Sequence, residues 1–168
     1  MRGKCGCLIR TPEQMYEYTK SVKDAKKFIL QTSTMDRCGR LKPMLSGMKK
    51  SPAIVFDIDE TIFQTHCWNC GEQLDNIIPI NPMKSFYKWC VDKNIAIFFV
   101  TARTEGAREY TFNELKKNGF DKYAHLFMMS DNVNRITFAV QTFKSNCRKT
   151  ISDKFTILAN FGDQPHDI

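Results

Sequence analysis

The sequence predicts an α/β fold with a parallel sheet. Four short apolar runs, 53–56, 95–100, 126–129 and 156–160, alternate with stretches of helical pattern. Runs of Val, Ile and Phe without polar alternation are typical of strands buried on both faces. Strands that alternate with helices need crossover connections, and such connections produce parallel pairing. The content of 42% hydrophobic and 26% charged residues is that of an ordinary globular chain.

Three helices are expected between and beyond these strands. One begins at Asn81 and Pro82, because Asn is a preferred cap and Pro fits the first turn. A second opens at Thr104 and ends at Gly119, with Phe112 and Leu115 facing inward. The third covers residues 143–154.

Residues 1–50 differ in pattern from the rest of the chain. Glu13 to Leu30 carries apolar residues at near-helical spacing and predicts an amphipathic helix. Arg37 to Lys50 is basic and interrupted by glycine and proline, which predicts a loop. We therefore expect residues 1–50 to form a helical and basic segment packing on the core. Residues 51–168 would form the main α/β domain, with a small flap at about 63–80.

The formal net charge is +7, with a pI near 9.1. A basic excess attracts anionic partners, and phosphorylated substrates and nucleic acid both qualify. The alternative is that the excess only aids solubility.

Seven cysteines, an odd number, form no tidy disulfide framework. No apolar segment follows the basic first residues, and no run reaches the length of a membrane span. These patterns predict a cytoplasmic protein without a membrane partner. We expect Cys67 and Cys70, a single CxxC pair, to be free thiols. The alternative is half a zinc site, which Cys5 and Cys7 or His66 would complete.

Polar and charged side chains follow three of the predicted strands: Asp57 to Thr61, Thr101 to Arg103, and Gly162 to Asp167. In parallel sheets, ligands bind beyond the carboxyl ends of the strands. Carboxylates gathered there repel one another, and a hard cation such as Mg2+ relieves the repulsion because it prefers carboxylate oxygens. The alternative is an acidic surface turn.

Asp57 and Asp59 are two residues apart, and on extended chain both would point the same way. One carboxylate can then attack phosphorus while the other moves the proton. Arg103 can hold a phosphate by its planar fork. It could pair with Glu105 or Glu109 instead.

Four segments resemble the motifs of the haloacid dehalogenase (HAD) superfamily. FDIDET is similar to hhhDxDxT, VTAR to the second motif, Lys144 in FKSNCR to the third, and NFGDQPHDI to GDxxxD. The resemblance spans Ile54 to Asp167. Within the superfamily it is greatest to the class B and plant acid phosphatases and their vegetative storage protein relatives.

This resemblance implies a Rossmann-like, three-layer parallel sheet with an N-terminal helical segment and no large cap domain. It also implies a role for each motif residue. The catalytic residues would be Asp57 and Asp59, the phosphate ligands Thr101, Arg103 and Lys144, and the metal ligands Asp57, Asp59 through its carbonyl, Asp163 and Asp167. His166, inside the fourth motif, is a further candidate for substrate contact.

The expected function is magnesium-dependent hydrolysis of phosphate monoesters through an aspartyl-phosphate. The substrate would be a nucleotide or another small phosphomonoester, and an open site would admit larger ones. Three alternatives remain: a weakly catalytic storage or binding relative, a phosphatase or binder directed at nucleic acid, and a transferase using the same intermediate. A homo-oligomer is compatible with an open site.

Overall fold

The computed structural model describes residues 10–43, 50–65, 77–134 and 136–167. In chain order the elements are α1 (Pro12–Thr32), β1 (Ser33–Met35), β2 (Leu41–Pro43), β3 (Ser51–Phe56), β4 (Phe63–Gln64), β5 (Ile78–Pro79), α2 (Asn81–Asp92), β6 (Ala96–Thr104), η1 (Glu105–Ala107), α3 (Arg108–Lys117), β7 (His125–Met129), α4 (Thr137–Lys154), β8 (Phe155–Phe161) and η2 (Pro165–Asp167).

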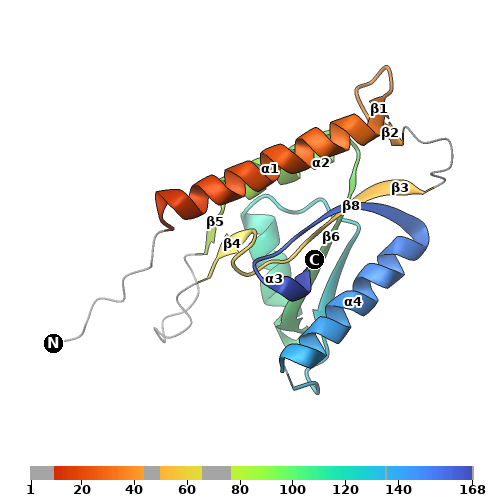
Figure 1. Ribbon diagram of the computed structural model, residues 1–168. Helices are drawn as coiled ribbons and strands as arrows, with labels where there is room; N and C mark the ends of the chain where they lie inside the picture. The colour runs from red at the N-terminus through yellow and green to blue at the C-terminus, as the bar shows by residue number, and fades with distance from the viewer. Residues whose placement is uncertain (1–9, 44–49, 66–76, 135, 168) are drawn as a thin grey trace.

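The central sheet has four strands in the order β7-β6-β3-β8, and all of its pairs are parallel. Helices lie between consecutive strands of this sheet, which is the arrangement that the alternating pattern predicts. The predicted α/β fold with a parallel sheet is therefore confirmed. Figure 1 shows α1 and α2 above the sheet and α4 below it.

Side chains of β3 alternate between the two faces of the sheet. Ile54 and Phe56 pack in the core on the side of α1 and α2, while Ala53 and Val55 pack with Cys147 of α4. Because both faces are covered, the strand contains no polar residue between Pro52 and Asp57. The three-layer architecture thus follows from the continuous apolar run.

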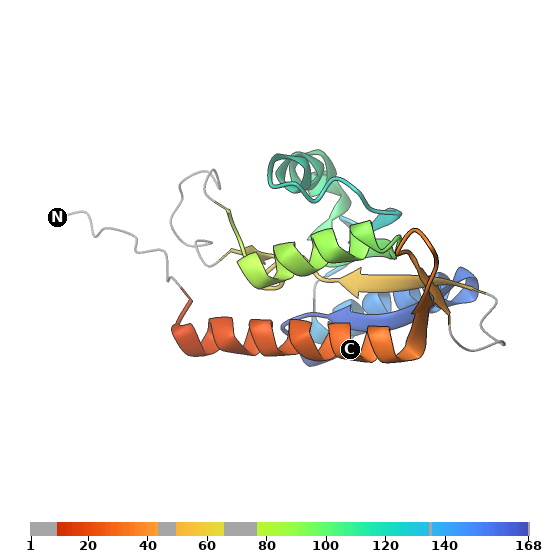
Figure 2. The same cartoon turned by 90° about the horizontal axis from the view of Figure 1, so that it is seen from above.

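Helix α1 belongs to the same core. Thr11 caps it with a capping box, and Pro12 fits the first turn. Its residues Val22 and Ile29 are buried in the cluster that contains Phe56 and Phe86. Figure 2 shows α1 and α2 side by side, and the two helices are in contact.

Several element boundaries differ from those predicted. Strand β6 continues to Thr104 because Thr104 pairs with Met129 of β7, a contact between segments distant in sequence. Helix α4 begins at Thr137, earlier than the apolar pattern indicates. Leu41–Pro43, expected in a loop, pairs with β1 as a short antiparallel strand.

Two details of the expected helices are wrong. Ile80 rather than Asn81 caps α2, and no side-chain hydrogen bond closes that end. Ile80 is buried, so packing fixes this helix start. On α3, Phe112 is 47% exposed because Thr111, Glu114 and Leu115 face inward instead.

The expected flap lies largely outside the described residues. On either side of residues 66–76, β4 and β5 form an antiparallel pair in which Phe63 faces Pro79. Among the helices described, none combines the length and apolar character needed to cross a membrane.

Replacing Ile29 with Ala tests whether α1 contributes to the core. Ile29 is fully buried, so its truncation should lower the free energy of unfolding by about 2–5 kcal/mol. The adjacent Leu30, 41% exposed, provides the matched control, and Leu30→Ala should cost about 1 kcal/mol or less. Urea unfolding followed by circular dichroism measures both values. Equal costs would mean that α1 does not pack on the core in solution.

Candidate active site

The ends of β3 and β8 bring the first and fourth motifs together. Phe56 pairs with Phe161 as the last residue of each strand, and the Asp57 N–H donates to the Phe161 carbonyl at 2.8 Å. The chain then leaves both strands at the same edge of the sheet. Residues more than a hundred positions apart in sequence thereby become neighbours.

Three carboxylates converge at this edge. One oxygen each from Asp57, Asp163 and Asp167 can be chosen so that all lie within 4.8 Å of one another. Asp57 and Asp167 are buried, and Asp163 is exposed. A set of carboxylate oxygens with one side open to solvent suits a hard divalent cation such as magnesium, which keeps several waters. The donor set therefore fits the ion that the resemblance implies.

Lys144 of α4 supplies a positive charge to this cluster. Its Nζ donates to Asp57 Oδ1 at 2.7 Å and also to Asp167 Oδ1. Burial opposes the charge of Lys144, but the two aspartates raise its pKa above the ordinary value. Burial raises the pKa of Asp57 to about 7, although the Lys144 charge acts in the opposite direction. The site is thus dry enough for its charges to interact strongly.

Asp167 is held in place by the short η2 turn. Its Oδ2 accepts the Gln164 N–H at 3.0 Å, and its own N–H donates to the Gln164 carbonyl at 2.9 Å. Gly162 permits this closure, because a Cβ there would lie 2.0 Å from the Asp167 Cβ. The glycine of the fourth motif is needed for a close approach rather than for an unusual φ angle.

Glu60 connects the first motif to the N-terminal segment. Its φ is 56°, in the left-handed region. The Glu60 carbonyl accepts hydrogen bonds from Arg10 Nη2 at 3.0 Å and from the Tyr18 hydroxyl. Its carboxylate accepts from Thr65 N and Oγ1 at 2.6 and 2.8 Å, and it pairs with Arg10. These contacts brace the loop that carries the two aspartates.

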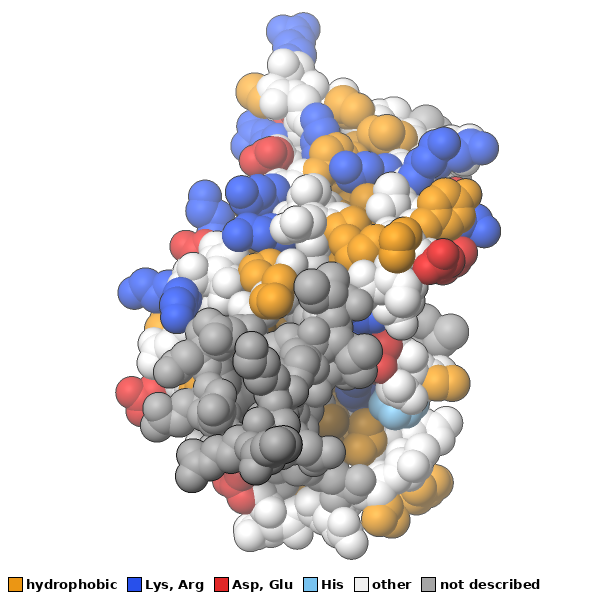
Figure 3. Space-filling view, turned by 90° about the vertical axis from the view of Figure 1, so that its left-hand side faces the viewer, with side chains coloured by type: hydrophobic (Ala, Val, Ile, Leu, Met, Phe, Trp, Pro, Cys, Tyr) orange, Lys and Arg blue, Asp and Glu red, His pale blue; other side chains and the backbone are white. Residues whose placement is uncertain are grey.

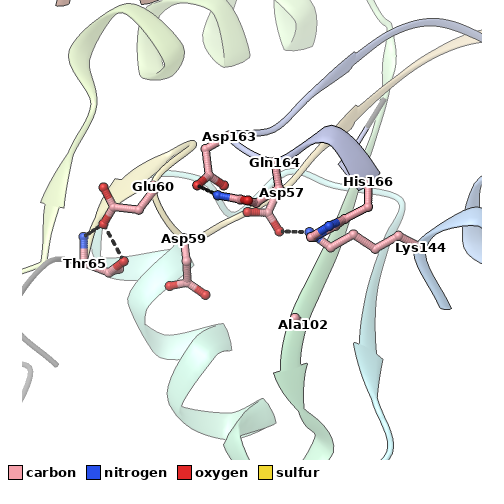
Figure 4. A pocket seen from close by; sticks show the side chains of 9 residues that line it. All are labelled: Asp57, Asp59, Glu60, Thr65, Ala102, Lys144, Asp163, Gln164 and His166. Atoms are coloured by element: carbon pink, nitrogen blue, oxygen red, sulfur yellow. Dashed lines mark hydrogen bonds and ion pairs between the residues drawn. The ribbon is translucent and has the colours of Figure 1, made fainter. Parts of the chain in front are cut away.

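Asp59 does not share the direction of Asp57. Figure 4 shows the Asp57 carboxylate near Lys144, whereas that of Asp59 turns away toward a helix below it. The expectation that both point the same way is wrong, because β3 ends at Phe56 and the chain bends after it. Arg103 Nε and Nη2 instead donate hydrogen bonds to the Asp59 carboxylate at 2.7–3.2 Å.

Arg103 has partners on its other side as well. Its Nη1 donates to Thr111 Oγ1 at 3.2 Å and to Glu114 Oε2 at 2.5 Å. Burial works against its charge, but Asp59 and Glu114 raise the pKa of Arg103 above the ordinary value. Neither sequence candidate is the partner here, since Glu105 instead pairs with Arg108.

A solvent-open cavity is lined by Asp57, Asp59 and Asp163, among other residues. Thr101 and Arg103, predicted to hold phosphate, are not part of its lining. Thr101 is fully buried, and its Oγ1 accepts the Arg103 backbone N–H at 3.2 Å. A phosphate contact by Arg103 would require it to exchange one of its carboxylate partners. The phosphate-binding roles of both residues stay predictions, and the same holds for Lys144, which does line the cavity.

The cavity has a volume of about 270 Å³ and is open to solvent. Its lining comprises the predicted residues Asp57, Asp59, Lys144, Asp163 and His166 together with Glu60, Thr65, Ala102 and Gln164. In Figure 3 a histidine, pale blue, borders a hollow beside acidic side chains in red. The candidate zinc ligands lie outside the described residues: Cys5, Cys7, His66, Cys67 and Cys70.

Two residues of this arrangement were not predicted from the sequence, Glu60 and Glu114. Glu60 is an acidic residue inside the first motif and could have been noticed there. Its hydrogen bond with Arg10 could not, because the two residues are 50 positions apart. Glu114 carries no motif signal. Its role becomes visible only when α3 packs and turns that side chain toward Arg103.

Comparisons with known proteins identify the family of the chain. The sequence profile of the acid phosphatase family described as HAD superfamily, subfamily IIIB, matches residues 68–168. The resemblance to HAD acid phosphatases is thereby confirmed. No curated protein sequence matches the chain significantly.

Solved structures share the fold at low sequence identity. A class C acid phosphatase from Bacillus anthracis with tungstate bound has a TM-score of 0.64 and 18% identity over 95% of this chain and 67% of that chain. A second structure of the class C acid phosphatase from Bacillus anthracis gives 0.63 and 18%, covering 94% of this chain and 66% of its own. A structure of a Pnkp1/Rnl/Hen1 complex gives 0.51 and 16%, with 81% and 51% covered. The chain spans about two thirds of the length of the phosphatases.

Gly162→Ala should disrupt the cluster of Asp57, Asp163 and Asp167 while leaving the sheet intact. The new Cβ must displace Asp167, so we expect the affinity for a divalent cation to fall about tenfold or more, as when a group supporting a metal ligand is lost. Gly106→Ala is the control, because its Cβ meets only the exposed Asp131 carboxylate, at 3.0 Å. Isothermal titration calorimetry measures both affinities. An unchanged affinity in Gly162→Ala would show that Asp167 does not support the cation.

The raised pKa of Asp57 predicts a pH-dependent stability in metal-free protein. The folded state prefers protonated Asp57, so this contribution is present below about pH 4 and lost as the pH rises through about 7. Asp57→Asn has no such titration and does not lose this contribution. The free energy of unfolding of Asp57→Asn minus that of wild type should therefore rise across this range by at most about 4 kcal/mol. Urea unfolding in EDTA at the two ends of the range tests this. A difference that is constant with pH would contradict it, and added magnesium should narrow the difference.

Proposed function

We propose, since the chain belongs to the acid phosphatase family of the HAD superfamily (subfamily IIIB), that it hydrolyses phosphate monoesters through an aspartyl-phosphate at Asp57 with the help of a magnesium ion. Family membership makes the chain a phosphomonoesterase. The magnesium ion and the roles of the individual residues are the proposal. The observation that carries it is the convergence of Asp57, Asp163 and Asp167 around Lys144.

Asp57 is the proposed nucleophile. One of its oxygens attacks phosphorus, the bond from phosphorus to the ester oxygen breaks, and an aspartyl-phosphate forms. The hydrogen bond from Lys144 Nζ to Oδ1 orients the carboxylate and leaves Oδ2 for this attack. Lys144 also places positive charge beside the phosphoryl oxygens, where negative charge accumulates in the transition state.

Asp59 is the proposed acid and base. It gives its proton to the departing ester oxygen and later takes one from the water that attacks the aspartyl-phosphate. That second attack releases phosphate and restores Asp57. Its carboxylate lines the same cavity but is separated from that of Asp57, which leaves room for a phosphoryl group between the two.

The aspartates Asp57, Asp163 and Asp167 would hold the magnesium ion, with the backbone carbonyl of Asp59 as a further ligand. When bound, the ion supplies charge that offsets both the carboxylate repulsion and the substrate phosphate. The open cavity fits the head of a small phosphomonoester, such as a nucleotide. We also propose that the protein acts in the cytoplasm.

Turnover of p-nitrophenyl phosphate should require both magnesium and Asp57. EDTA should abolish the rate, and Asp57→Asn should lower kcat by roughly 10³-fold or more because the nucleophile is lost. Asp92→Asn, an exposed change on α2, is the control and should keep the wild-type rate. Acid-quenched wild type should carry a phosphoryl group that hydroxylamine removes.

Equal rates for wild type and Asp57→Asn would refute the proposal. Phosphate binding without turnover in the wild type would favour a storage or binding relative. A panel that includes nucleotides, sugar phosphates and end-phosphorylated oligonucleotides identifies the substrate class. Discrimination among them would appear as different values of kcat/KM.

A further inference from the structure

A row of ion-paired side chains leads from the cavity to helix α3. Asp59 lines the cavity, Arg103 lies behind it, and Glu114 of α3 lies behind Arg103. The side chains of Arg103 and Glu114 are only 7% and 9% exposed, whereas that of Asp59 is 26% exposed. This row of ion pairs therefore begins at the cavity, with Asp59, and ends inside the protein, with Glu114.

The guanidinium of Arg103 is fixed on both sides. Nε and Nη2 form a fork on the Asp59 carboxylate, with its shortest contact at 2.7 Å. Nη1 is tied to α3 through Thr111 and Glu114, and Glu114 Oε1 in turn accepts from the Tyr110 hydroxyl. Because the guanidinium is planar and rigid, its anchoring on α3 determines the plane in which Asp59 is held.

We propose that Glu114 is a positioning residue for the acid and base: through Arg103 it sets the orientation of the Asp59 carboxylate toward the departing ester oxygen. The inference rests on the proposed function, because it takes Asp59 as the acid. Glu114 itself touches no substrate, since it lies outside the cavity lining. It acts only through the guanidinium.

A purely structural ion pair would hold α3 on the sheet without affecting the chemistry. The distinction lies in the leaving group. An alkoxide is a poor leaving group and needs a proton from Asp59, whereas p-nitrophenolate departs without one. Loss of Asp59 orientation should therefore slow the transfer of the phosphoryl group to Asp57 much more from an alkyl phosphate than from p-nitrophenyl phosphate. The aspartyl-phosphate formed is the same for both substrates, so kcat/KM, which reports the first transfer, is the value to compare. A structural defect would slow both equally.

The experiment compares glycerol 2-phosphate with p-nitrophenyl phosphate for wild type, Glu114→Gln and Glu105→Gln. In Glu114→Gln we expect kcat/KM for glycerol 2-phosphate to fall about tenfold or more relative to kcat/KM for p-nitrophenyl phosphate, a part of what general acid catalysis contributes. KM should change little, since no substrate contact is lost. Glu105→Gln is the matched control, because Glu105 forms an exposed ion pair with Arg108 and should leave both rates unchanged.

A double-mutant cycle with Asp59→Asn completes the test. If Glu114 acts through Asp59, then Glu114→Gln should have no further effect on the ratio of the two rates once Asp59 is replaced. If Glu114→Gln does not fold, Thr111→Val carries the test, since it removes one Nη1 acceptor while keeping the side-chain shape. It should change the ratio in the same direction by a smaller factor.

Three outcomes would overturn the inference: equal losses for both substrates, a full effect in the Asp59→Asn background, or a rise in KM that points to a direct phosphate contact by Arg103. Failure of the proposed function is recognised separately. In that case wild type and Asp57→Asn hydrolyse p-nitrophenyl phosphate at the same rate, whatever the result at Glu114.

Discussion

The arrangement of the site depends on one buried ammonium group. Lys144 Nζ lies between Asp57 and Asp167, which are far apart in the sequence. Without it, two buried carboxylates would face each other in a region of low dielectric, and one would have to take up a proton. The lysine reaches this position from the third turn of α4, which packs on the sheet through Cys147 and Ile151. The packing of one helix thus determines the electrostatics of the site.

Charge is distributed unevenly around the two aspartates of the first motif. Asp57 shares a lysine with another aspartate and lies beside the cluster suited to a cation. Asp59 is gripped by an arginine that a second carboxylate, Glu114, also binds. Two acidic residues only two positions apart therefore stand in different environments. Such separation is what a nucleophile and a proton donor in one site require.

Helix α1 and Arg10, which precedes it, contact the site at Glu60. Arg10 and Tyr18 both reach the carbonyl of Glu60, directly after Asp59. Arg10 also lies over the Tyr18 ring, at 4.8 Å from its centroid. Since Val22 and Ile29 anchor the same helix in the core, the loop of the first motif is supported by a rigid element. Support by a packed helix keeps the side chains of a site in a fixed geometry.

The sequence alone predicted the parallel α/β fold and the sheet edge at which the motifs meet. Continuous apolar runs require burial on both faces, and polar residues directly after them must lie at the strand ends. Its strand and helix boundaries were less accurate: β6 extends to Thr104 and α4 starts at Thr137, because pairing and packing with distant segments fix those ends.

Only the tertiary structure decided which charged groups pair. The sequence offered Glu105 and Glu109 as partners for Arg103, whereas the fold supplies Asp59 and Glu114. Pairing depends on side-chain direction, and direction after Phe56 depends on a bend that no local pattern encodes. Gly162 illustrates the same limit: its place in a motif is visible in the sequence, but the close approach of Asp167 that requires it appears only once η2 has closed.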